Sequence, residues 1–305
     1  MSEPSITAWA VTVGVIVALV AFDLWHSARN PRPARVRAAA ACSLFYVCVA
    51  VAFGVALAVV AGSDLATQYF AGYVVEKSLS VDNLFVFVII MSTFAVPVEQ
   101  QPRLLMAGIV GALLLRTVFI ALGAAMLDAF SFTYLLFGIA LVLAGVQLFR
   151  HRDKARSTRP NGLVTALERR LQLGPCALAL VAIASTDIVF AFDSIPAVFG
   201  VTEHAYIVFA ANAFALLGLR ALFFLVAGLL ERLVYLSIGL AAILAFIGLK
   251  LALHFVHTQH PGVPEIPTAL SLGVIITTLV VTAAASWLKG AVPPTVREEL
   301  QPLSR

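Results

Sequence analysis

The sequence predicts an all-α, polytopic transmembrane helical bundle of about nine spans that contains an inverted three-helix repeat. Of its 305 residues, 61% are hydrophobic and 12% are charged, and the mean hydropathy is +1.00. The apolar residues form long continuous runs, and a helix that crosses a bilayer needs roughly 20 of them. One acidic motif also occurs in each half of the chain. Backbone N–H and C=O groups in lipid must form their hydrogen bonds within the protein, so such runs favour helices.

Turn residues and charges divide the chain into the predicted spans. Glu3, and not a basic segment, precedes the first apolar run, so we expect that run to be retained as a span instead of being cleaved as a signal. The predicted spans cover residues 8–25, 37–61, 69–94, 103–125, 131–149, 174–198, 205–229, 232–256 and 267–288.

The predicted spans group into five parts. Two N-terminal transmembrane helices (1–62) precede a first three-helix repeat (63–149). A basic cytoplasmic loop (150–173) leads into the second three-helix repeat (174–257). A C-terminal transmembrane helix with a cytoplasmic tail (258–305) follows.

The distribution of basic residues predicts the orientation. Sixteen of the 20 Lys and Arg residues fall in linkers that alternate to one side of the spans, and the opposite linkers hold none. Lys and Arg accumulate on the cytoplasmic side of membranes. We therefore expect a multi-pass protein of the inner (plasma) membrane with its N-terminus outside and its C-terminus in the cytoplasm. This pattern explains the net charge of +4 without nucleic acid.

Several ionisable residues fall inside the predicted spans. Such a group costs about 2.5–3.5 kcal/mol at the centre of a helix on insertion scales, so it is usually paired or functional. Asp23 and Lys250 lie near span ends, where the membrane interface explains them. The others concentrate in two places, which the repeated motif defines.

The motif pairs two carboxylates six residues apart. Glu76 and Asp82 lie in EKSLSVDNLFVF, and Asp187 and Asp193 lie in TDIVFAFDSIPAVF. The next span contains Arg116 in the first copy and Arg220 in the second, and a third span follows each. Three spans per unit turn the second copy upside down in the membrane. Inverted repeats with a midplane site between them are frequent in secondary transporters.

The acidic motifs predict a site for a hard divalent cation. Carboxylate, amide and hydroxyl oxygens suit Mn²⁺, Ca²⁺ and Mg²⁺, and ligand type alone leaves these three open. When the site is empty, nearby cations or protons must balance the acids, so proton coupling fits. The expected ligands are Glu76, Asp82, Asn83, Asp187, Asp193 and Ser194, and the expected charge-balancing residues are Lys77, Arg116 and Arg220.

Helical phase constrains this site. Positions six apart on a helix diverge by about 120°, whereas positions seven apart nearly eclipse. Glu76 should therefore share a face with Asn83, and Asp187 with Ser194. A single metal centre then needs a crevice between helices or a local unwinding. Pro196 favours a helix break in the second copy, because it leaves the carbonyl of the residue four positions earlier without its donor.

Two other interpretations of the acids compete with a cation site. A buried lattice of salt bridges would fix the packing of helices and transport nothing. An aspartic protease dyad is disfavoured because no GxGD sequence surrounds either Asp. The three cysteines lack CxxC spacing, so neither a disulfide framework nor a thiolate site is indicated.

The strings EKSLSVDNLFVF (76–87), STDIVFAFDSIPAVFG (185–200) and NAFALLGLRALFFL (212–225) resemble the TerC family, bacterial integral membrane proteins named for tellurite resistance. The resemblance covers about residues 66–255 and implies manganese efflux. It carries over Glu76, Asp82, Asp187 and Asp193 as the motif acids. Many members have a Glu where this chain has Ala184, which reduces the ligand count here. Apart from the basic residues already expected to balance the acids, nothing in the sequence looks suited to an oxyanion path.

These observations predict a membrane exporter of Mn²⁺ that works by alternating access and is not an enzyme. Its partners are the transported ion and the lipid bilayer, and no cofactor is expected to stay bound. The alternative is a non-transporting membrane scaffold or a component of a stress-resistance (tellurite) complex. The oligomeric state is left open.

Overall fold

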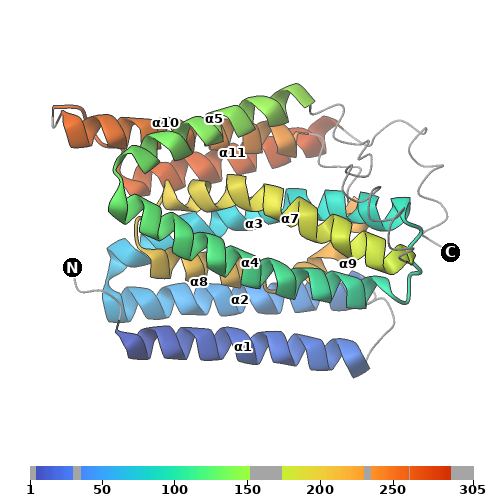
Figure 1. Ribbon diagram of the computed structural model, residues 1–305. Coiled ribbons are helices and arrows are strands. Elements are labelled where there is room, and N and C mark those ends of the chain that lie inside the picture. Colours follow the sequence, from blue (N-terminus) through green and yellow to red (C-terminus); the bar gives the residue numbers. More distant parts are fainter. Residues whose placement is uncertain (1–4, 30–35, 152–173, 230–234, 261, 290–305) are drawn as a thin grey trace.

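The computed structural model describes residues 5–29, 36–151, 174–229, 235–260 and 262–289. Its helices lie roughly along one axis, with α1 at one side of the bundle and α5, α10 and α11 at the other (Figure 1). The predicted loop 150–173 lies almost wholly outside these residues. The described helices are α1 (Ile6–Arg29), α2 (Val36–Ala61), α3 (Ser63–Thr93), α4 (Gln101–Ala129), α5 (Phe132–His151), α7 (Pro175–Phe199), α8 (Ala205–Leu216), α9 (Leu219–Leu229), α10 (Leu236–Gln259) and α11 (Thr268–Lys289).

The predicted class, an all-helical multi-pass membrane protein, is confirmed. Seven described helices are long and apolar enough to cross a membrane, and α8 with α9, bent by 43°, makes up to eight. The predicted span 69–94 corresponds to α3, whose charged residues exclude it from that count. The nine-span count and the inverted repeat therefore stay predictions.

Helix α3 lies in the middle of the bundle. It contacts α2, α7, α8, α9, α10 and α11, and Tyr69, Glu76 and Leu84 are each 0% exposed. Protein, not lipid, therefore surrounds the ionisable residues in its centre, which is the environment such groups need.

Helices α5 and α10 approach each other very closely through glycine. A Cβ atom on Gly138 would lie 2.7 Å from the carbonyl oxygen of Gly248, and one on Gly145 would lie 2.8 Å from that of Ala241. Small residues allow this approach in membranes, where the gain comes from packing. The pair fixes the outer wall of the bundle beside α7 and α11.

The break in the second copy of the motif region lies in a different helix from the one the sequence predicts. Helix α7 continues through Pro196 to Phe199. The proline removes the one helical bond that its own N–H would make, and the helix ends only three residues later, at Phe199. The chain instead breaks between α8 and α9, where Leu217 is extended and Gly218 has a φ of 77°.

Lys77 stabilises this break from α3. Its Nζ donates to the carbonyl oxygens of Ala215 at 3.0 Å and Leu217 at 3.3 Å. A helix end that lacks its own donors needs such a partner. The role predicted for Lys77, charge balance at the acidic site, is thus not what its contacts show.

Candidate functional site

The two acidic motifs meet at one guanidinium group. Arg116 on α4 forms an ion pair with Glu76 on α3, and its Nη2 lies 3.6 Å from Oδ1 of Asp187 on α7. All three side chains are buried: Glu76 is 0%, Arg116 1% and Asp187 4% exposed. The first acid of each motif therefore shares a single cation in the interior of the bundle. We call these three residues the acid–arginine triad.

Close helix packing brings the triad together. A Cβ on Gly108 of α4 would lie 2.9 Å from Ile183 of α7, and one on Gly72 of α3 would lie 3.0 Å from Val198 of α7. Glycine thus lets α3 and α4 both approach α7, which places their side chains within reach of Asp187. The sequence predicts the residues of the triad, but the close packing of α3 and α4 against α7 is what brings them into contact.

The triad has more oxygen atoms than its contacts use. Ser80 donates to Oε1 of Glu76 at 3.1 Å. Within the described part of the chain, Oε2 of Glu76, Oδ2 of Asp187 and Oγ of Ser194 are buried without a hydrogen-bond partner. A buried polar atom left unsatisfied costs about 1–3 kcal/mol. With both acids ionised, one guanidinium also leaves one negative charge uncompensated. The triad can accept an additional cation or protons.

The other predicted ligands agree with the helical phase. Asn83 and Ser194 are buried on the same faces as Glu76 and Asp187, and Asp82 and Asp193 are only half-buried to the side. Among the described residues, no three His, Cys, Asp or Glu side chains are grouped to hold a metal ion. The predicted ligands therefore do not form one coordination sphere in this conformation.

Arg220 balances a different acid from the one expected. Its Nη2 lies 2.7 Å from Oδ1 of Asp23, which joins α9 to α1. Asp23 is 7% exposed, so it is a buried ion-pair partner, which its position near a span end does not by itself predict. Of the three predicted charge-balancing residues, Arg116 is the one that contacts motif acids.

Asn212 is a buried polar residue that the sequence analysis did not single out. It lies on α8 and is 1% exposed, and neither atom of its amide has a hydrogen-bond partner among the residues that the structure describes. In the sequence, Asn212 is the one strongly polar side chain in the apolar stretch AYIVFAANAFAL, and that isolation could have indicated a special role. Every residue of this stretch after Ala205 is buried. Its amide oxygen is of the same ligand class as that of Asn83.

Comparison with known proteins gives a family. The sequence model described as "Integral membrane protein TerC family" matches residues 61–292. An uncharacterized membrane protein of Mycobacterium tuberculosis is 42% identical over 311 residues, which cover 92% of this chain and 78% of that protein. One of Myxococcus xanthus is 38% identical over 307 residues, covering 94% of each. A protein of Shigella flexneri that is called a membrane-bound redox modulator is 36% identical over 310 residues, covering 90% and 92%. No solved structure matches.

Proposed function

The chain belongs to the TerC family of integral membrane proteins, and from that premise we propose that it exports a hard divalent cation, Mn²⁺ first, from the cytoplasm. The proposal places it in the inner (plasma) membrane, with the N-terminus outside and the C-terminus in the cytoplasm. It is a transporter and not an enzyme, and the metal is its cargo.

The acid–arginine triad is the observation that supports the proposal most. A purely structural ion pair needs one carboxylate for one guanidinium, whereas Arg116 serves two acids from two helices. Burial of this excess negative charge is costly unless a further positive charge arrives during function. The spare oxygens of Glu76, Asp187 and Ser194 are hard ligands for such a charge.

In the proposed cycle, Arg116 and one proton together neutralise Glu76 and Asp187 when no ion is bound. An entering cation takes over their oxygens, and Arg116 moves aside because a guanidinium and a metal ion repel each other. Asp82, Asp193 and the amides and hydroxyl nearby complete the coordination as the helices rearrange in alternating access. Protons released from or taken up by these acids supply the coupling.

Cellular manganese tests the proposal. In a bacterial strain that lacks its own manganese exporters, expression should lower manganese content. Glu76→Gln, Asp187→Asn, Asp82→Asn or Asp193→Asn should remove most of this effect at equal protein level. Glu99→Gln removes an exposed carboxylate outside the helices and should leave export intact. Normal export by the Glu76 and Asp187 variants would overturn the site.

The same strain can show which metal is exported, and whether the protein is a transporter or a non-transporting scaffold. Parallel measurements of calcium and magnesium decide whether Mn²⁺ is preferred. A membrane scaffold or a component of a stress-resistance complex should change none of the three metals by itself, and the motif substitutions should then have no effect on metal content.

A further inference from the structure

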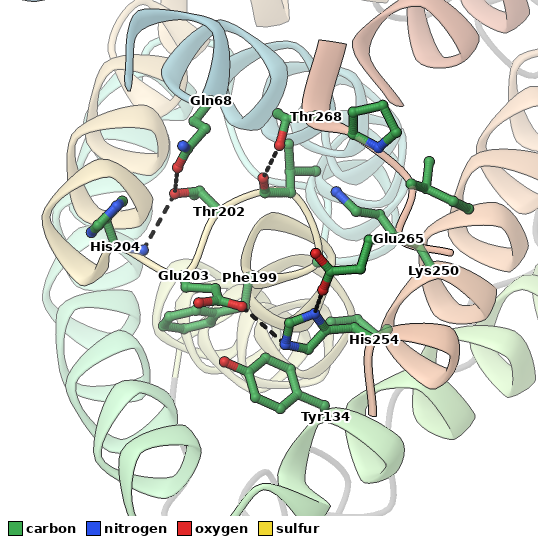
Figure 2. Close-up of a pocket in the computed structure, with 15 residues that line it drawn as sticks. Gln68, Tyr134, Phe199, Thr202, Glu203, His204, Lys250, His254, Glu265 and Thr268 are labelled. Atoms are coloured by element: carbon green, nitrogen blue, oxygen red, sulfur yellow. Dashed lines mark hydrogen bonds and ion pairs between the residues drawn. The ribbon is translucent and has the colours of Figure 1, made fainter. Parts of the chain in front are cut away.

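A polar pocket of about 330 Å³ lies at the end of the bundle where α7 ends and α8 begins. Its wall combines the 200–204 loop, the first turns of α3 and α5, the last turns of α10, and the segment that leads into α11. Figure 2 shows polar side chains from all of these elements directed into it. None of them belongs to the acid–arginine triad. The charge distribution predicts that this end faces outside.

One histidine connects two walls of the pocket. Nε2 of His254 on α10 lies 3.1 Å from Oε1 of Glu203 in the 200–204 loop. Its Nδ1 lies 2.6 Å from Oε1 of Glu265, in the segment before α11. The imidazole thus stands between two carboxylates, as the dashed lines in Figure 2 show. We call these three residues the histidine clasp.

The chemistry of imidazole makes the clasp depend on a proton. A carboxylate accepts hydrogen bonds and cannot donate them when ionised, so both ring nitrogens must carry hydrogen to make both contacts. Only the charged imidazolium has both, whereas the neutral ring donates once and has one acceptor nitrogen. Loss of one proton therefore turns one of the two contacts into repulsion between lone pairs.

The other charged and titratable groups around the clasp are compatible with this state. The ring of Tyr134 on α5 lies 4.5 Å from that of His254, and Tyr134 and Glu203 line the same pocket. Lys250 on α10 lines the same pocket, as does His204 in the loop. Asp128, at the end of α4, acts on Tyr134 from further away.

Glu203 stays ionised where the imidazolium forms. The hydrogen bond from His254 is the main cause that lowers the pKa of Glu203 below its ordinary value. A carboxyl group with a lowered pKa contributes stability at neutral pH and loses it only as the pH falls through the folded-state pKa. At pH values above the pKa of Glu203 and below the pH at which the His254 ring loses its proton, the carboxylate and the imidazolium are both charged.

We propose that His254 is a proton-binding site whose protonation ties two walls of the pocket together, the 200–204 loop and the segment before α11, and whose deprotonation releases one of them. Two other contacts at the pocket do not depend on the proton that His254 loses. Thr202 donates to Gln68 at 2.6 Å, and a neutral His257 can still donate through Nδ1 to the carbonyl of Val263, 2.5 Å away. Opening is thus a local movement of the loop or of the segment before α11. The inference goes beyond the proposed function, since it does not depend on which ion is transported.

Labelling of a cysteine in the pocket tests the clasp. Cys42, Cys48 and Cys176 are replaced by Ser in the full-length protein in liposomes, and Leu251→Cys supplies a thiol in the pocket wall, where Leu251 is 3% exposed. The rate of reaction with a small charged methanethiosulfonate reagent is measured at about pH 5.5 and about pH 8.5, on either side of the ordinary imidazole pKa of about 6.5. Because thiols react faster at high pH, each rate is divided by that of Ser131→Cys, an exposed position at the same end of the bundle.

The normalised rate should rise about fivefold between the two pH values, the factor expected when a partly exposed charged contact is lost. His254→Gln should label fast at both pH values, and His254→Arg, which stays charged, should label slowly at both. His257→Gln should keep the parental pH dependence. The proposal is overturned if the parent shows no rise, if His254→Gln keeps it, or if His254→Arg labels fast. No metal is present, so this result stands apart from the transport experiments.

Discussion

At the scale of single residues, the chain places its charges in pairs that a linear sequence does not reveal. Charged residues in apolar runs are conspicuous, which is why Glu76, Asp187 and Arg116 are predictable as members of a site. Their partners are not, because Arg116 and Arg220 occupy similar apolar surroundings in the sequence. Only the approach of α1 to α9 assigns Arg220 to Asp23 and leaves Arg116 with the motif acids.

Arg116→Gln should destabilise the protein strongly in the absence of metal. The substitution leaves two buried carboxylates without their cation, and breaking a buried ion pair costs about 3–5 kcal/mol. Thermal unfolding in detergent measures the loss. Arg103→Gln, which removes an exposed arginine at the start of α4, is the matched control and should change little.

Mn²⁺ should raise the unfolding temperature of the Arg116→Gln variant more than that of the parent. An ion that binds only the folded protein at 100 times its Kd stabilises it by about 2.7 kcal/mol, and the variant no longer has a guanidinium to displace. A variant as stable as the parent without metal would show that Arg116 does not compensate the acids. If Mn²⁺ raised the unfolding temperature of the variant and the parent equally, the acid–arginine triad would not be part of the metal site.

At the scale of helices, local signals and tertiary contacts disagree about where the chain breaks. Proline is the strongest breaker in the sequence, yet α7 accommodates Pro196 near its end. The break at Gly218 depends on Lys77, which lies about 140 residues earlier and supplies donors to the freed carbonyls. A pattern of local residues cannot contain that contact. The helical phase of the motifs, by contrast, is local, and the burial of Asn83 and Ser194 follows it.

Gly218→Ala should destabilise the kink between α8 and α9. The φ of 77° lies in the left-handed region, where a Cβ costs about 1–2 kcal/mol, and a Cβ would also lie 2.8 Å from the ring of Tyr46. Gly111→Ala is the control, because a Cβ there meets nothing within 4 Å and alanine favours a helix by about 1 kcal/mol. Thermal unfolding should rank Gly111→Ala at or above the parent and Gly218→Ala below it. The reverse order would contradict the strained turn.

At the scale of the whole molecule, hydrophobic runs predict the class of fold well because lipid leaves a chain so few choices. The count of spans is harder, since α3 combines the length of a span with the charges of a site. Its position inside the bundle, in contact with six other helices, resolves this physically: neighbours shield the charges from lipid. The same position gives α3 access to both the triad and the kink.

Flux of Mn²⁺ in purified protein tests the central claim most directly. Liposomes that contain the protein, with a metal-sensitive dye inside, should show Mn²⁺ entry above that of empty liposomes, through the molecules inserted in the appropriate orientation. Glu76→Gln and Asp187→Asn should each reduce the rate by more than about tenfold, a loss typical even for outer partners of a metal, and Glu99→Gln should retain it. No flux by the parent with or without a pH gradient, or parental flux by both triad variants, would contradict the account.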